Sequence, residues 1–256
     1  MTVNYTEEEW QAIFDKAEES LPHSPIAYNV PKPGSAAFAQ MVDHTLLKTD
    51  ATGEQIDRLC EEAIRYKFKS VCVRLPWIPR CFHNLQGTLV IVACVVGFPE
   101  GTHSTSSKVN EATAGIKSGA SELDVVLNYP LLHHNNYTEI YTDLHTVRTA
   151  APSSTLKVIL ETSQLNRKEI IAGCKIAEAA GADFVKTSTG FCGEGATREN
   201  VSLMRGVVGG SGVKVKASGG VRTMGDFVGM VEAGAERVGT SGGVGIMEEA
   251  SRGDSV

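Results

Sequence analysis

The sequence predicts an α/β protein built as a (β/α)8 TIM barrel with an N-terminal helical extension. From residue 35 onward, eight short apolar segments alternate with eight helical segments. A helix-Gly-Ala-strand joint also recurs, at residues 118–120, 180–182 and 233–235. Each copy provides a glycine to end a helix and a small residue before the next strand. Eight strands in strict alternation fit a closed parallel barrel, and a doubly wound open sheet is the structural alternative.

The chain divides into an extension at 1–34 and a barrel domain at 35–256. Thr6 is the expected N-cap of a first helix, and Glu9 stands three residues later at the capping-box position. Prolines then recur between residues 21 and 34, which predicts an extended linker. We expect the extension to be either an arm at a subunit interface or a cap on the barrel floor.

Within the barrel domain, apolar runs and turn residues set the expected elements. The predicted strands cover residues 41–43, 70–74, 89–96, 122–128, 157–161, 184–187, 213–217 and 237–240. The predicted helices cover residues 52–66, 78–84, 106–117, 137–150, 167–180, 197–207 and 224–232, with a last helix from Gly243.

Composition excludes several classes of protein. The chain has 24 basic and 30 acidic side chains and a net charge of −6, which argues against nucleic acid or an anionic membrane as a partner. No apolar run approaches the roughly 20 residues that span a bilayer, and the N-terminus lacks the features of a secretory signal. We therefore expect a cytoplasmic protein. Its six cysteines are scattered without a C-x-x-C pair, which favours reduced, mostly buried thiols and argues against a zinc site.

Polar residues inside the predicted strands indicate where chemistry occurs. Strand residues two apart share a side, so Lys186, Lys216 and Asp124 are each expected to face the barrel lumen. Asp43 ends the first strand and Glu161 the fifth. In this fold, catalytic residues gather at the carboxyl ends of the strands. Two lysines and several carboxylates are therefore expected to converge there.

The pair Lys186 and Lys216 carries the chemical prediction. Neighbouring ammonium groups in a dry lumen lower an amine pKa through desolvation and repulsion. A neutral lysine forms a Schiff base with a carbonyl, and Asp124 would then carry protons, alone or through a water. Taken singly, each lysine could be a snorkelling side chain, and each carboxylate a structural ion-pair partner.

Glycines follow the last three predicted strands, at Gly190, at Gly219 and Gly220, and at Gly242. Loops at these positions commonly bind phosphate through backbone N–H groups and a helix N-terminus. The alternative is that the glycines only make tight turns. Their occurrence in three successive loops favours a phosphate site.

Taken together, seven motifs resemble the deoxyribose-phosphate aldolase family, in order from about residue 35 to about residue 246. They are MVDHTLLK (41–48), SVCVR (70–74), ELDVVLN (122–128), KVILET (157–162), FVKTSTGF (184–191), VKASGGVRT (215–223) and RVGTSG (237–242). The resemblance implies a metal-free class I aldolase on a (β/α)8 barrel. Such enzymes reversibly cleave 2-deoxy-D-ribose 5-phosphate to D-glyceraldehyde 3-phosphate and acetaldehyde.

The resemblance also implies residue roles. Lys186 would form the Schiff base, Lys216 would tune it, and Asp124 would be the acid/base that works through water. Asp43 and Cys72 would line the pocket, with Asp43 binding a substrate hydroxyl. The phosphate would contact the turns at Thr189, Gly190, Gly219, Gly220, Ser241 and Gly242. The resemblance allows a homodimer.

Two positions depart from the family pattern. Lys214 stands where a small residue is common, and its parity places it inward near the barrel floor, where it should need a carboxylate such as Glu161. Phe191 stands where relatives often have a lysine, so a phosphate contact would be lost or replaced, for example by Arg222. Two other functions remain open: an isomerase or synthase of phosphate sugars, which needs no lysine pair, and a non-catalytic sugar-phosphate-binding barrel, which forms no covalent adduct.

Overall fold

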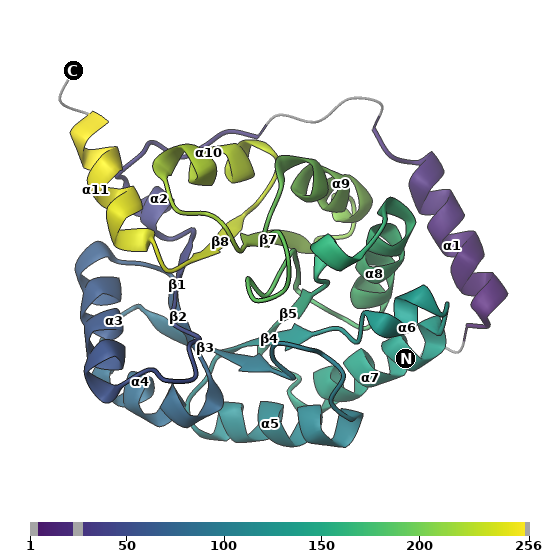
Figure 1. Ribbon diagram of the computed structural model, residues 1–256, viewed down its shortest axis with the longest axis horizontal. Helices are drawn as coiled ribbons and strands as arrows, with labels where there is room; N and C mark the ends of the chain where they lie inside the picture. The colour runs from purple at the N-terminus through teal and green to yellow at the C-terminus, as the bar shows by residue number, and fades with distance from the viewer. Residues whose placement is uncertain (1–4, 23–27, 254–256) are drawn as a thin grey trace.

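The computed structural model describes residues 5–22 and 28–253, and in this part of the chain the predicted barrel is confirmed. Eight parallel strands pair in sequence order, and β1 pairs with β8 to close the ring (Figure 1). The strands are β1 (Val42–Thr45), β2 (Ser70–Val73), β3 (Ile91–Val96), β4 (Glu122–Val126), β5 (Thr155–Ile159), β6 (Phe184–Lys186), β7 (Lys214–Ser218) and β8 (Arg237–Thr240). Their ends differ from the predicted ones by at most two residues.

The helices form a layer around the strands (Figure 1). Those predicted from the sequence are present, and their ends differ from the predicted ones by at most one residue; α2, α6 and two single 3-10 turns are additional. The helices are α1 (Glu7–Glu19), α2 (Ala36–Ala39), α3 (Gly53–Tyr66), α4 (Ile78–Asn84), α5 (Thr105–Lys117), α6 (Pro130–His133), α7 (Tyr137–Ala150), α8 (Arg167–Ala179), α9 (Arg198–Val208), α10 (Met224–Glu232) and α11 (Gly243–Gly253).

The recurring joint has the geometry its sequence predicts. Gly119, Gly181 and Gly234 all have a positive φ, between 85° and 113°. In each copy the alanine after the glycine donates its N–H to a carbonyl five residues earlier, at 3.0 Å. This bond closes the end of the helix and turns the chain into the next strand.

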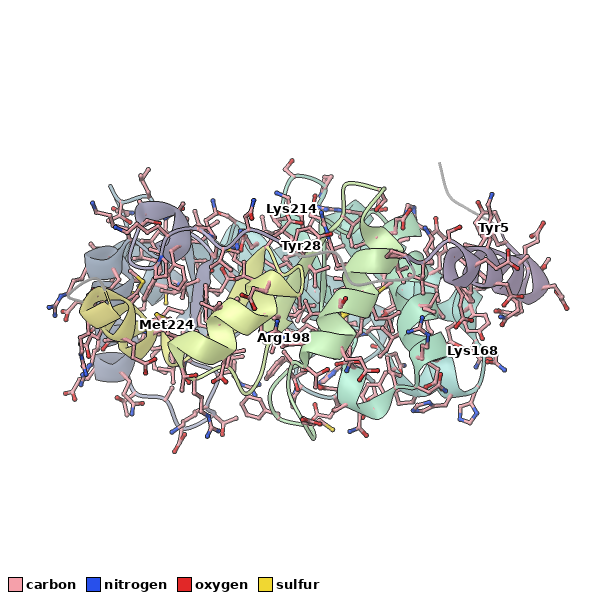
Figure 2. The ribbon with its side chains drawn as sticks, turned by 90° about the horizontal axis from the view of Figure 1, so that it is seen from above. Tyr5, Tyr28, Lys168, Arg198, Lys214 and Met224 are labelled. Carbon is pink, nitrogen blue, oxygen red and sulfur yellow. The ribbon has the colours of Figure 1, made fainter. Side chains whose placement is uncertain are left out.

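The N-terminal extension lies beside the barrel. Thr6 and Glu9 form the predicted capping box of α1. Trp10 and Phe14 are buried, and their rings contact Tyr141 and Tyr137 on α7. The helix packs on α7 and α8, outside the helix layer, and Figure 2 shows it at one end of the molecule. The prediction of a cap on the barrel floor is therefore wrong, because the apolar face of α1 fits the helix layer. A role as a subunit arm stays a prediction, and part of the linker, residues 23–27, lies outside the described residues.

The apolar core has two parts. The larger part lies between the strands and the helices, and it includes the face of α1. A smaller cluster contributes to the lumen and consists of Leu47, Cys72, Ala93, Val95, Phe98, Val126 and Ile159. We call this second group the inner apolar cluster. Among the described residues no helix is long and apolar enough to cross a membrane, and the cytoplasmic location stays a prediction.

Candidate active site

Lys186 and Lys216 lie in the lumen on adjacent strands, as predicted. They are register partners on β6 and β7, and their exposed fractions are 2% and 0%. Both ammonium nitrogens donate to the same oxygen, Asp124 Oδ2, at 2.8 Å. Since each lies 2.8 Å from that oxygen, the two nitrogens are at most about 5.6 Å apart.

The lumen also holds two cations that were not predicted from the sequence, Lys157 and Arg237. Lys157 donates to Asp124 Oδ1 at 2.7 Å and lies 2.6 Å from Glu122 Oε2. Arg237 donates to Asp43 Oδ1 at 2.6 Å. Strand parity was the available signal, since Lys157 lies two residues before Ile159, whose side chain faces the lumen.

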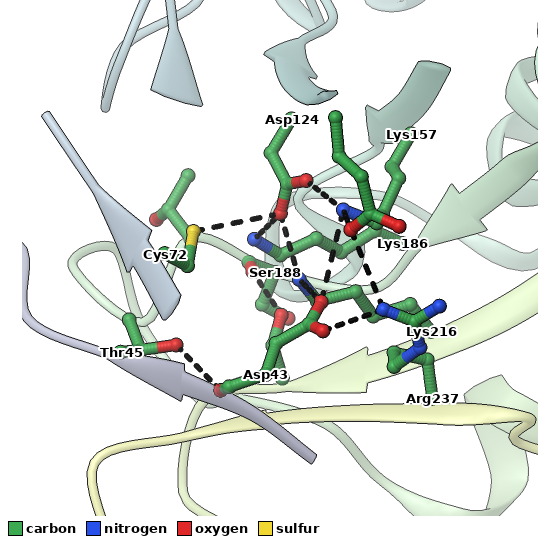
Figure 3. A network of polar contacts seen from close by, with 12 residues as sticks. Asp43, Thr45, Cys72, Asp124, Lys157, Lys186, Ser188, Lys216 and Arg237 are labelled. Carbon is green, nitrogen blue, oxygen red and sulfur yellow. Dashed lines mark hydrogen bonds and ion pairs between the residues drawn. The ribbon is translucent and has the colours of Figure 1, made fainter. Parts of the chain in front are cut away.

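Asp43 links Lys216 and Arg237 within the network of ion pairs in the lumen (Figure 3). Its Oδ2 accepts from Lys216 Nζ at 2.5 Å, and its Oδ1 accepts from Ser70 Oγ at 2.6 Å. The described residues of the network comprise four cations, Lys157, Lys186, Lys216 and Arg237, and three carboxylates, Asp43, Glu122 and Asp124. One cation is in excess, so the network is neutral when one of them loses its proton.

The environment identifies which lysine that is. Burial lowers the pKa of Lys186, and the positive charge of Lys216 lowers it further, against the attraction of Asp124. Burial also acts on Lys216, but Asp124 and Asp43 outweigh it and raise the pKa of Lys216. The carboxylates likewise raise the pKa of Lys157. Of these three described lysines, Lys186 alone is driven toward the neutral amine, in the direction predicted.

Asp124, unlike Lys186, is stabilised in its charged form. Burial opposes its ionisation, but Lys157, Lys186 and Lys216 together hold the pKa of this carboxyl well below its usual range. It is therefore a carboxylate next to the amine.

Cys72 Sγ lies 3.9 Å from Asp124 Oδ2, and burial, with the Asp124 charge, raises the pKa of Cys72 to about 11. Cys72 is thus a neutral thiol in the inner apolar cluster.

The predicted phosphate turns gather at the carboxyl ends of β6, β7 and β8. Gly190 and Gly219 both have φ of +82° and Gly220 has +80°. A Cβ on Gly219 would lie 2.9 Å from the Cα of Gly195, so only glycine lets these two loops pack. Gly242 donates its N–H to Thr240 Oγ1 at 2.8 Å, directly before α11 begins. Ser241 is exposed beside it.

Thr189 and Glu161 form an interaction that was not predicted. The N–H and the hydroxyl of Thr189 both donate to Glu161 Oε2, at 3.1 and 2.5 Å. Glu161 has a left-handed backbone, with φ of 60°, just beyond the end of β5. Its Oε1 is buried and has no hydrogen-bond partner among the described residues, and burial raises the pKa of this carboxyl.

The prediction that Lys214 needs a buried carboxylate such as Glu161 is wrong. Lys214 begins β7 at the amino end, is exposed, and lies 5.7 Å from the centre of the Phe184 ring. Glu161 follows β5 at the carboxyl end. Figure 2 shows Lys214 at the upper edge of the molecule. Lys214 has the same strand parity as Lys216, as predicted, but at the amino end of β7 its side chain reaches solvent and needs no carboxylate partner.

Comparisons with known proteins identify the family of this chain. The profile of a family described as DeoC/LacD family aldolase matches residues 37–247. A deoxyribose-phosphate aldolase of Coccidioides immitis is 51% identical, covering 96% of this chain and 93% of its own length. One from Staphylococcus epidermidis is 49% identical, covering 82% and 95%.

A crystal structure of a putative deoxyribose-phosphate aldolase from Coccidioides immitis superposes with a TM-score of 0.93. It is 51% identical, and the match covers 97% of this chain and 99% of that one. Sequence, fold and lumen chemistry lead to one conclusion: this chain belongs to the DeoC/LacD family of aldolases.

Proposed function

We propose that the protein is a class I aldolase that reversibly cleaves 2-deoxy-D-ribose 5-phosphate to D-glyceraldehyde 3-phosphate and acetaldehyde, with Lys186 as the Schiff-base lysine. The observation that supports this best is the contrast among the lumen lysines. Lys186 has a lowered pKa, whereas the pKa values of its neighbours Lys157 and Lys216 are raised. The names of the relatives support the substrate.

The reaction begins when the neutral amine of Lys186 adds to the C1 aldehyde of the open-chain sugar. Loss of water gives an iminium, which is the electron sink, so no metal or cofactor is required. The C3 hydroxyl then loses its proton and the C2–C3 bond breaks. Its electron pair moves toward the iminium, forms an enamine and releases glyceraldehyde 3-phosphate. Protonation of the enamine at C2 gives the acetaldehyde iminium, which water hydrolyses.

Asp124 and Lys216 have complementary roles in these steps. Asp124 is a carboxylate 2.8 Å from the Lys186 nitrogen, so it accepts the proton of the C3 hydroxyl through a water and returns a proton to C2. Lys216 keeps its charge and thereby keeps Lys186 neutral. Asp43 holds Lys216 in place through its Oδ2 at 2.5 Å, and a substrate hydroxyl would have to share this carboxylate with Lys216.

The phosphate binds at the carboxyl ends of β6 to β8. Backbone N–H groups of Gly190, Gly219, Gly220 and Ser241 and the N-terminus of α11 after Gly242 supply the donors. Both donors of Thr189 contact Glu161, so Thr189 serves this site by shaping its turn. Arg222 remains the candidate for the contact that relatives make with a lysine.

Borohydride trapping tests the proposal. Incubation with acetaldehyde and sodium borohydride should leave an N-ethyl group on Lys186, identified by peptide mass spectrometry. Lys186→Met should lose both the adduct and the cleavage activity, while the exposed-lysine variant Lys214→Met keeps both. Wild-type enzyme without an adduct on Lys186 would falsify the Schiff-base reaction and leave an isomerase, a synthase or a binding protein. A homodimer remains a prediction, and size-exclusion chromatography with light scattering tests it.

A further inference from the structure

Arg237 holds the lumen network together at the amino ends of the strands (Figure 3). It is the first residue of β8 and the register partner of Lys216 on β7. Its Nη1 donates to Asp43 Oδ1 at 2.6 Å and to Glu122 Oε2 at 3.3 Å. Its guanidinium also lies 5.4 Å from the centre of the Phe184 ring. One buried guanidinium thus joins carboxylates from two strands, β1 and β4.

The charge of Arg237 is fixed. A guanidinium keeps its proton at any pH that a folded protein tolerates. Burial opposes this charge, but Asp43 and Glu122 outweigh it and raise the pKa of Arg237. The other three cations of the network are lysines, and each can lose a proton. The positive charge in excess must therefore be lost from one of the lysines.

The four cations differ in how many carboxylates they contact. Among the described residues of the network, Lys157 forms ion pairs with three carboxylates, Lys216 and Arg237 with two each, and Lys186 with Asp124 alone. Asp124 is also shared with the other two lysines. A buried ammonium with one shared partner loses least when it gives up its proton. The ion pairs of the other cations therefore make Lys186 the neutral amine.

Four titratable groups surround Lys186. Asp124 on β4 contacts it, and the charges of Lys216 on β7 and of Cys72 on β2 act on it. Glu161, just beyond β5, is also within range of its charge. Substitutions at Arg237 and Glu122 leave all four groups unchanged. A changed titration of Lys186 in such variants therefore reports the charge balance of the network.

We propose that Arg237 is a positioning residue for the reacting amine, acting from the opposite end of the network. It neutralises Asp43 and Glu122 at the amino ends of the strands. The other two lysines therefore remain on Asp124, and Lys186 is the cation in excess. Without Arg237, three lysines face three carboxylates, and Lys186 keeps its proton. This inference rests on the proposed Schiff-base reaction and adds the residue that prepares its nucleophile.

The acid limb of the pH dependence of kcat/KM for cleavage tests this role. In Arg237→Met the limb should move to higher pH, and activity at pH 7 should fall about tenfold. One unit charge at about 10 Å, in an effective dielectric constant of about 20, changes an equilibrium by about this factor. Arg237→Lys keeps the charge and should keep the limb near its wild-type position. The matched control is Arg198→Met, which removes an exposed arginine that pairs with Glu232 on the helix layer.

Glu122→Gln is the opposite perturbation. It leaves four cations with two carboxylates, so the acid limb should move to lower pH. The double variant Glu122→Gln/Arg237→Met has three cations and two carboxylates, the same excess as the wild type, and its limb should return toward the wild-type position. Damage to the fold would move both single variants in one direction, and a second substitution would not repair it.

Direct titration of Lys186 separates this inference from the proposed reaction. Reductive methylation with formaldehyde and cyanoborohydride, followed by peptide mass spectrometry at a series of pH values, measures the neutral amine without any need for cleavage activity. The midpoint should rise in Arg237→Met and fall in Glu122→Gln, even if the wild type cleaves no 2-deoxyribose 5-phosphate.

Two results would overturn the inference. One is an unchanged midpoint in Arg237→Met whose circular dichroism matches the wild type. The other is a shift of both single variants in the same direction. If Arg237→Met does not fold, Glu122→Gln decides alone, and a midpoint that is not lower than that of the wild type overturns the inference.

Discussion

Removal of the charge on Lys216 should lower the cleavage activity at neutral pH, while the substrate still binds. The Lys186 and Lys216 nitrogens lie within about 5.6 Å, since both bond to one oxygen of Asp124 at 2.8 Å. At an effective dielectric constant of about 20, their repulsion is about 3 kcal/mol. About 1.4 kcal/mol corresponds to a factor of ten, so Lys216→Met should lower the neutral fraction of Lys186 by about a hundredfold.

The assay is the pH dependence of kcat/KM for cleavage, whose acid limb follows the deprotonation of Lys186 in the free enzyme. In Lys216→Met this limb should move to higher pH, and activity at pH 7 should fall about a hundredfold and recover partly in alkali. Lys216→Arg keeps the charge and should leave the limb near its wild-type position. Circular dichroism checks the fold of both variants. An acid limb that stays in place in Lys216→Met would refute the electrostatic reasoning.

Three further predictions concern other buried groups. Lys108 donates to Asp143 at 2.6 Å in the core, so Lys108→Met should cost about 3–5 kcal/mol in urea unfolding; a loss below 1 kcal/mol would contradict a buried ion pair. The thiol of Cys72 has its pKa raised to about 11, so it should react with iodoacetamide at pH 7.5 more slowly than the half-buried Cys192. Peptide mapping measures both rates, and faster labelling of Cys72 would contradict the prediction. Burial raises the pKa of Glu161, so its ionised form is disfavoured in the fold. The free energy of unfolding of the wild type should fall, relative to that of Glu161→Gln, as pH rises above the usual carboxyl range. The same difference between the two proteins at pH 5 and at pH 8 would contradict this.

The sequence predicted the barrel because its signals are local and repeated. Each joint such as Ala180-Gly181-Ala182 fixes one helix end, and the alternation of strand and helix then leaves little freedom in the topology. The inward orientation of Lys186, Lys216 and Asp124 followed from strand parity, which is reliable while the chain stays extended.

Strand parity predicts which side a residue faces only while the chain is extended, and it does not say how deep in the barrel that residue lies. Glu161 lies beyond β5 with φ of 60°, so its side chain could not be placed by counting from Lys157. Lys214 follows parity but lies at the solvent end of β7. The contact of Phe191 with Arg74 joins loops from opposite sides of the ring, and no spacing along the chain encodes such a distance.

The charge network beneath Lys186 has a consequence for the order of events in turnover. Lys157, Glu122 and Arg237 fill the lumen below the amine, so the active site is a blind channel with a single entrance. The sugar must enter with its aldehyde leading, and after cleavage the three-carbon phosphate lies between the bound two-carbon fragment and the exit. Glyceraldehyde 3-phosphate therefore leaves first, and in synthesis acetaldehyde must be loaded before it, so the shape of the barrel imposes the same order of binding and release as the covalent enamine on Lys186.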